Sequence, residues 1–118
     1  MIKLYFMRHA EASDDAPDDA SRPITKRGRK RTQNAAQVLV KLGVNPLHIY
    51  ASPRVRAQET AAIVAEALGK RVETRPECDF DFNVEAVRNM TTGFEHNTEV
   101  LFVGHNPSMS SVVNAISG

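Results

Sequence analysis

Two histidines and several arginines lie in three short segments whose residue types suit phosphoryl chemistry. The segments are Arg8-His9, the basic stretch Ser52-Pro53-Arg54-Val55-Arg56, and Gly104-His105-Asn106-Pro107. Arginine stays charged at any relevant pH and holds phosphoryl oxygens through paired N–H donors. An unprotonated imidazole nitrogen can attack phosphorus. The three segments therefore predict a site for an anionic, phosphorylated substrate.

Each of these side chains has an expected role. Arg8 and Arg56 are expected to hold phosphoryl oxygens, and their charges should lower the pKa of nearby imidazoles from the usual value of about 6.5. His9 is then the expected nucleophile, forming a phosphohistidine intermediate that water hydrolyses. His105 is expected to stabilise the equatorial phosphoryl oxygens during transfer. No second Cys or His stands at metal-ligand spacing, so we expect no metal and no cofactor.

The elements that must position these residues alternate between strand and helix. Alternating and continuous apolar residues predict strands over 2–7, 48–52, 71–74 and 100–103, and an acidic, Pro-containing loop is expected over 11–22. We expect Thr25 to cap the first helix, Pro53 to open the second, Asn83 to cap the third, and Asn106 with Pro107 to start the fourth. Apolar residues at helical spacing predict four buried stripes: Ala35, Val38, Leu39 and Leu42; Ala61, Val64, Ala65 and Leu68; Val84, Val87 and Met90; and Met109, Val112, Val113 and Ile116.

This order predicts one α/β domain over 1–118, built as a three-layer α/β/α sandwich around a largely parallel sheet. Ligands bind beyond the carboxyl ends of the strands in such sheets. The three segments that could do chemistry all follow predicted strands, so we expect them to meet at one edge of the sheet. The sequence ends after the helix that follows His105.

Composition narrows the classes of protein. The chain has 118 residues, is 42% apolar and 25% charged, and carries a net charge of +1, which argues against binding nucleic acid through the overall field. Six of the ten residues from Arg22 to Arg31 are basic, but we interpret them as an exposed helix face that attracts an acidic protein partner. One cysteine, Cys78, excludes an internal disulfide and has no basic neighbour to activate it. No membrane span or signal-peptide core stands out, so we expect a cytoplasmic location.

Four motifs in order resemble the histidine phosphatase superfamily, which has the phosphoglycerate mutase-like fold. Phe6-Met7-Arg8-His9-Ala10 resembles the Arg-His-Gly motif, residues 52–60 (SPRVRAQET) resemble the S-x-x-x-R-A-x-x-T element, and residues 103–107 are similar to the second-histidine motif. Residues 22–28 (RPITKRG) resemble the R-P-L-T-x-x-G element of the SixA-like phosphohistidine phosphatases. The resemblance implies that His9 is phosphorylated, that Arg8, Arg56 and His105 form the phosphate pocket, and that Arg22 is an additional phosphate or substrate contact.

The sequence departs from the family pattern in three places. Ala10 replaces the motif glycine, and the glutamate general acid of many relatives has no clear match among Glu11, Glu77, Asp79 and Asp81. From the resemblance we also expect this sequence to lack the final strand or strands of the family. A phosphohistidine substrate needs less acid catalysis, because a protonated imidazole is a good leaving group. We therefore expect a metal-independent phosphatase that acts on phosphohistidine in a protein domain. The alternatives are a phosphatase of small phosphomonoesters with the same mechanism and a non-catalytic phosphate-binding module. We expect no membrane partner, and the sequence leaves the oligomeric state open.

Overall fold

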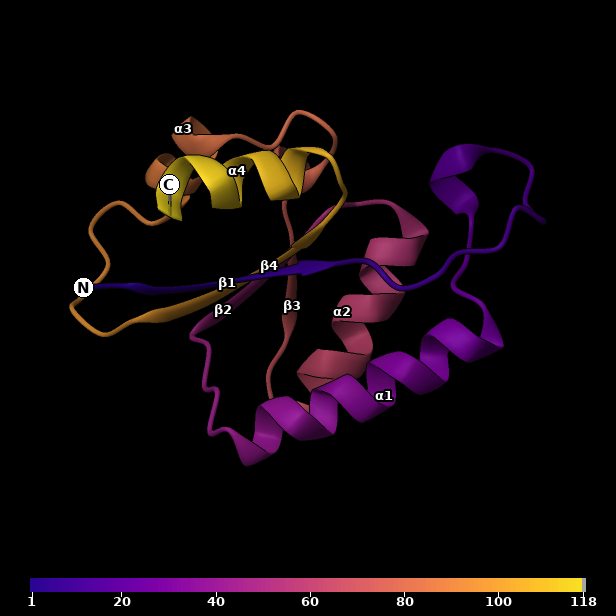
Figure 1. Cartoon of the computed structure of the whole chain (residues 1–118), viewed down its shortest axis with the longest axis horizontal. Coiled ribbons are helices and arrows are strands. Elements are labelled where there is room, and N and C mark those ends of the chain that lie inside the picture. The colour runs from indigo at the N-terminus through magenta and orange to yellow at the C-terminus, as the bar shows by residue number, and fades with distance from the viewer. Residues whose placement is uncertain (118) are drawn as a thin grey trace.

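A computed structural model gives the fold and describes residues 1–117. Within this range, four parallel strands form one sheet in the order β1-β4-β2-β3. The strands are β1 (Lys3–Arg8), β2 (His48–Ala51), β3 (Val72–Thr74) and β4 (Glu99–Gly104). The helices are α1 (Lys26–Lys41), α2 (Val55–Leu68), α3 (Val84–Met90) and α4 (Ser108–Ser117), with single 3₁₀ turns η1 (Asp19–Ser21) and η2 (Pro76–Cys78). Figure 1 shows α1 and α2 on one face of the sheet and α3 and α4 on the other, which confirms the predicted α/β/α sandwich.

Two apolar clusters fill the spaces between the layers. One joins the α2 residues Ala57, Ala61 and Val64 to Ile49 of β2 and Leu101 of β4. The other, on the opposite face, contains Cys78 and the aromatic residues Tyr50, Phe82 and Phe102. Strand β4 contributes to both clusters, which explains its continuous apolar run, as expected for a parallel strand covered on both faces. Cys78 is fully buried, and burial raises the pKa of its thiol to about 12, in agreement with a structural role.

The predicted buried stripe of α1 is wrong. Ala35 is exposed, and Val38 and Leu42 are 54% and 72% exposed, whereas Leu39 is half-buried. The buried residues of α1 are instead the small ones, Gly28, Thr32 and Ala36. Periodicity identified a helix but selected the larger apolar residues, whereas small residues let a helix backbone approach its neighbours closely.

The start and the buried face of α4 also differ from expectation. The helix begins at Ser108, one residue after Pro107, although the Asn106 side chain still accepts a hydrogen bond from the backbone N–H of Ser110 (3.1 Å). Met109 and Val112 are buried as predicted, but Val113 and Ile116 are partly exposed and line an open apolar groove against β1. Similarly, α2 begins at Val55, two residues after Pro53, which was expected to open it, and Arg54 is in the N-cap position.

A crevice lined by Arg8, His9 and Arg56 lies at the carboxyl end of β1, beside β4. The chain leaves β1 and β2 toward helices on one face of the sheet, but it leaves β4, which lies between them, toward α4 on the opposite face (Figure 1). Ligands bind at such a reversal in parallel α/β sheets. No helix within residues 1–117 is long and apolar enough to cross a membrane.

Candidate active site

The register of β1 and β4 brings His9 and His105 together. Arg8 is the partner of Gly104 in the sheet, and the backbone N–H of His9 donates to the carbonyl oxygen of Gly104 (2.9 Å). The two imidazole rings lie 5.1 Å apart between centroids, although they come from opposite parts of the chain. Two strand ends therefore place two imidazoles in one crevice.

One nitrogen of the His9 ring is held and the other is available. Nδ1 lies 2.7 Å from the carbonyl oxygen of Ala10, so we assign the ring proton to Nδ1, where it donates to that oxygen. The lone pair then lies on Nε2. Burial lowers the pKa of His9, and the charges of Arg56, Arg8 and Arg22 lower it further, against the opposing effect of the Ala10 hydrogen bond. The unprotonated form that a nucleophile requires is thereby favoured.

Ala10, which stands where the motif has glycine, fits its position. Among residues 1–117, Asn97 is the non-glycine residue with positive φ, so Ala10 needs no glycine-like conformation. Its backbone N–H donates to Thr60 Oγ1 (2.9 Å), and the Thr60 hydroxyl donates to the carbonyl oxygen of Arg56 (2.8 Å). The buried hydroxyl of Thr60 thus joins the turn after β1 to the first turn of α2.

His105 is buried and is oriented by a residue that the motif analysis left without a role. Its Nε2 lies 2.8 Å from Ser52 Oγ, just beyond β2, and with the serine donating, the ring proton lies on Nδ1. That Nδ1 is buried and has no hydrogen-bond partner within residues 1–117. Burial lowers the pKa of His105 to about 4, with smaller contributions from His9 and Arg56, so the ring is neutral at pH 7. An unpartnered N–H beside His9 can donate to a phosphoryl oxygen.

Arg56 extends from α2 into the same crevice. It is only 4% exposed; its Nη1 donates to the backbone carbonyl of Asp19 (2.8 Å) and its Nη2 to the Asp19 carboxylate (3.2 Å). Its Nε is buried and lacks a partner among the residues that the structure describes. A buried donor without a partner has a free-energy cost that an oxyanion would remove.

Asp19 is the main member of the site that the sequence analysis missed. One carboxylate oxygen accepts from Arg54 (2.7 Å) and Arg56, and the other accepts from Arg22 (3.2 Å). The hydrogen bond from Arg22, followed by those of the other arginines, lowers the pKa of Asp19. Asp19 lies in a loop with several acids, and only its position three residues before Arg22 could have singled it out. We infer that this carboxylate holds three arginines at the mouth of the site.

A second unanticipated cluster covers His105 from the side of η2. Arg54 donates through Nε to Asp79 (2.7 Å), and its guanidinium lies 4.0 Å from the centroid of the Phe80 ring. The Phe80 ring in turn meets the His105 ring edge-on, with 4.9 Å between centroids. The Asp79 carboxylate lies 3.5 Å from His105 Nε2. Arg54, to which the sequence analysis gave no role, therefore belongs to the wall of the site.

The carboxyl groups considered as proton donors are mostly engaged in other contacts. Glu11 accepts from Arg27 (2.6 Å) and Thr25, and these bonds lower the pKa of its carboxyl to about 2. Glu77 is paired with Arg75, which lowers its pKa. Asp79 is bound to Arg54, and the Asp81 side chain forms no hydrogen bond within the described chain. A carboxyl that stays ionised is a poor general acid at neutral pH.

An open cavity of about 540 Å³ contains most of the residues predicted for the site. It is lined by Arg8, His9, Glu11, Ala12, Arg22, Arg31 and Arg56, and His105 adjoins it behind His9. The structure thus brings Arg8, His9, Arg22, Arg56 and His105 to one place. Arg31, which the sequence analysis assigned to an exposed helix face, also lines the cavity.

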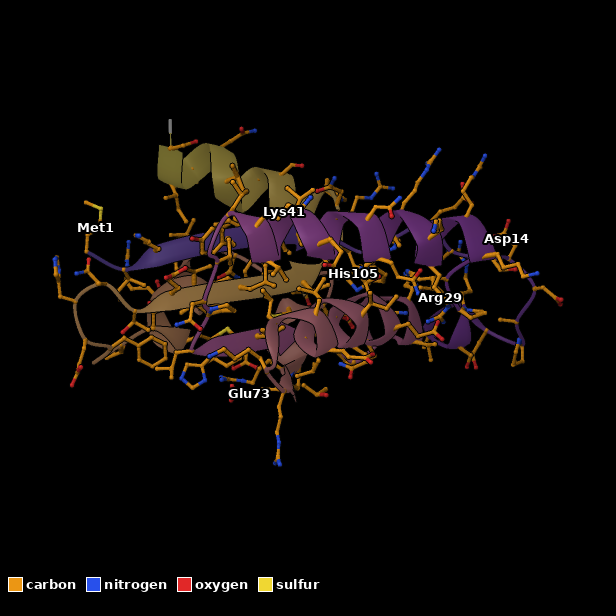
Figure 2. All side chains as sticks on the ribbon, turned by 90° about the horizontal axis from the view of Figure 1, so that it is seen from below. Met1, Asp14, Arg29, Lys41, Glu73 and His105 are labelled. Carbon is orange, nitrogen blue, oxygen red and sulfur yellow. The ribbon has the colours of Figure 1, made fainter. Side chains whose placement is uncertain are left out.

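In residues 1–117 no group of three or more His, Cys, Asp or Glu side chains is placed to hold a metal ion. Figure 2 shows His105 just beyond the end of β4, with Asp14 and Arg29 farther toward the same end of the molecule and Met1 at the other end.

Comparison with known proteins identifies the family. The sequence model of the histidine phosphatase superfamily, branch 1, matches residues 4–82. The chain belongs to the histidine phosphatase superfamily. An uncharacterized protein of Picosynechococcus sp. (strain PCC 7002) is 33% identical over 128 residues, which cover 98% of this chain and 73% of that protein. The mitochondrial serine/threonine-protein phosphatase Pgam5 of Drosophila ananassae is 40% identical over 65 residues, 55% of this chain and only 22% of Pgam5.

The structure of the protein histidine phosphatase SixA complexed with tungstate matches with a TM-score of 0.83 at 27% identity and covers 93% of this chain and 73% of that one. This match, together with the family assignment, confirms the predicted phosphoglycerate mutase-like fold and supports the SixA-like branch of the superfamily. The protein is accordingly a histidine phosphatase superfamily phosphatase.

Proposed function

We propose that this phosphatase removes the phosphoryl group from phosphohistidine side chains of proteins through a covalent intermediate on His9. The arrangement of His9 carries the proposal, because its Nδ1 is held by the Ala10 carbonyl while Nε2 is left for attack. Arg56 Nε and His105 Nδ1 are buried and have no hydrogen-bond partner within residues 1–117. Arg56 lines the cavity beside His9, and the His105 ring lies 5.1 Å from the His9 ring between centroids. The similarity to a SixA described as a protein histidine phosphatase supports the choice of substrate.

The reaction proceeds in two displacements at phosphorus. His9 Nε2 attacks, the bond from phosphorus to the substrate imidazole breaks, and the protonated ring leaves as a neutral imidazole. Water then attacks the phosphoryl group on His9, and inorganic phosphate and free His9 result. Arg8, Arg56 and His105 hold the equatorial oxygens in both steps, with Arg22 as an outer contact. All of these groups belong to the chain itself, so the proposed mechanism uses no metal.

A phosphomonoester substrate is the second candidate. The match to Pgam5, described as a serine/threonine-protein phosphatase, favours an ester. An alkyl phosphate leaves as an alkoxide and normally needs a proton donor. Glu11 and Glu77 are held ionised by arginines, so they are poor donors. The phosphohistidine substrate therefore fits the site better. A module that binds phosphate without turnover is the remaining alternative.

The test is a search for the covalent intermediate. The protein is mixed with a ³²P-labelled phosphohistidine peptide, quenched, and examined for acid-labile, alkali-stable label, with His9→Ala and the distant His96→Ala as matched variants. We expect label and phosphate release with the native protein and with His96→Ala, and neither with His9→Ala. Label that survives in His9→Ala would refute the proposed nucleophile. Faster turnover of small phosphate esters than of the peptide would establish a phosphomonoester phosphatase. Saturable phosphate binding without turnover would establish a phosphate-binding module.

A further inference from the structure

The cavity beside His9 is larger than the phosphoryl group needs. Transfer uses Arg8, His9, Arg56 and His105, whereas the cavity of about 540 Å³ extends past them to Glu11 and to Arg31 of α1. Volumes of roughly 300–1,000 Å³ are typical of sites that enclose whole ligands. Part of the substrate beyond its phosphoryl group therefore lies against α1.

The charges that face this outer part are not balanced. Arg22 is paired with Asp14 and Asp19, and Glu11 is paired with Arg27. Arg31 forms no hydrogen bond or ion pair within residues 1–117, although Arg27 and Arg29, on the same helix, each bind a glutamate. The charge of Arg31 contributes to the lowered pKa of Glu11, but its guanidinium lines the cavity without a hydrogen-bonded partner in that range.

A second hollow of about 210 Å³ adjoins the first at Arg31. Both are lined by Arg8, Glu11 and Arg31, and the second continues between β1 and α1 over mostly apolar and small residues, among them Met7, Ala10 and Ala35. Arg31 thus stands where the phosphoryl cavity meets a surface that could hold an aliphatic chain. A short acidic side chain matches this combination of an apolar stem and a charged end.

We propose that Arg31 forms an anionic subsite that binds the carboxylate of an Asp or Glu flanking the phosphorylated residue of a protein substrate. The inference rests on the proposed function and adds the class of sequence that the phosphatase prefers. A guanidinium and a carboxylate form two parallel hydrogen bonds, which fix geometry as well as adding affinity. The carboxylate would complete the pairing that the chain itself leaves open at Arg31.

Binding measurements test the subsite without depending on turnover. Two peptides carry a phosphonate analogue of phosphohistidine, in which a P–C bond replaces the labile P–N bond, with either Glu or Gln on each side. Their dissociation constants are measured by calorimetry for the native protein, for Arg31→Gln and for Lys30→Gln. Lys30 is the matched control, because it is the adjacent basic residue, is exposed, and lines neither hollow.

We expect the native protein and Lys30→Gln to bind the acidic peptide about tenfold more tightly than the neutral one. Arg31→Gln should lose this preference and bind the neutral peptide and inorganic phosphate as the native protein does. Native protein that binds both peptides equally, or binds neither, would overturn the subsite. Equal loss of the preference for the acidic peptide in Arg31→Gln and Lys30→Gln would also overturn the subsite, because it would indicate a diffuse field. Weaker phosphate binding by Arg31→Gln would overturn it too, because it would place Arg31 on the phosphoryl group. Failure of the proposed function is seen separately, as missing label on His9.

Discussion

The two histidines differ in the ring nitrogen that a hydrogen bond holds. His9 is tied through Nδ1 to the next residue of the chain, so its position follows directly from the end of β1. His105 is tied through Nε2 to Ser52, which lies beyond a different strand. The first arrangement leaves the lone pair on Nε2, and the second leaves a buried N–H on Nδ1. Under the proposed function, these two hydrogen bonds separate the nucleophile from the oxyanion donor.

The buried neutral state of His105 predicts a loss of stability in acid. Its pKa is about 4 in the folded chain and about 6.5 when unfolded. Between these values the unfolded chain binds more protons, so stability is full above pH 6.5 and falls as the pH drops toward 4. The effect is on the order of 3 kcal/mol. Urea unfolding at pH 7.5, 5.5 and 4.5 should show a shallower pH dependence for His105→Asn than for the native protein. A His96→Gln control should keep the native slope; equal slopes for all three proteins would contradict this account.

Replacing Asp19 should change how strongly the site binds anions. The Asp19 carboxylate accepts hydrogen bonds from Arg22, Arg54 and Arg56, so it offsets part of their positive charge. In Asp19→Asn that negative charge is gone, and inorganic phosphate should inhibit roughly two- to fivefold more strongly, as expected for a partly exposed ion pair. The inhibition constant is compared with that of Asp15→Asn, since Asp15 is exposed in the same loop and its side chain pairs with no arginine within residues 1–117. Weaker inhibition would mean that Asp19 positions Arg56 more than it competes with phosphate.

At the scale of elements, the start of α1 depends on close contact with the turn after β1. A Cβ added to Gly28 would lie 2.7 Å from the backbone oxygen of Glu11, which is too close for either backbone to remain in place. Gly28→Ala should therefore destabilise the fold by about 1–3 kcal/mol, which lowers Tm by several degrees in a chain of this size. Thermal unfolding followed by circular dichroism measures the change. Asn34→Ala, an exposed substitution in the same helix, is the control, and a Gly28→Ala Tm within a degree of the native value would show that the turn can move.

The elements were predictable because strand and helix periods differ clearly in this sequence, whereas contacts between elements were not. Strand β4 was identified from an apolar run that reflects burial on both faces. The face of α1 was missed because Gly28 and Ala36 give little hydrophobic signal and are buried by the approach of neighbouring backbone and of α2. Likewise, the motifs located His9, Arg56 and His105, but Asp19 and Phe80 enter the site only through tertiary contacts of loops.

At the scale of the whole molecule, a nearly neutral chain gathers arginines, with carboxylates that pair with several of them, at one end. The net charge is +1, yet all four strands are parallel and their carboxyl ends lie at the same edge of the sheet. Arg8 lies at the end of β1, Arg54 and Arg56 both follow β2, and Arg22 and Arg31 join them from the loop and α1. The topology therefore creates a local field that composition alone does not reveal.

This field predicts that catalysis depends on salt while folding does not. The screening length falls from about 30 Å at 0.01 M salt to about 10 Å at 0.1 M, so attraction of an anionic phosphopeptide to the arginine-rich edge weakens over that range. We expect kcat/KM for an acidic phosphohistidine peptide to fall about three- to tenfold. The unfolding free energy should change little, because the two apolar clusters are insensitive to screening. In Arg31→Gln the decline with salt should be shallower than in Lys30→Gln, since Arg31 lines the cavity and Lys30 does not. A kcat/KM of the native protein that stays constant with salt would contradict this prediction. It would show that the arginines contact the bound substrate but do not attract it over a longer distance.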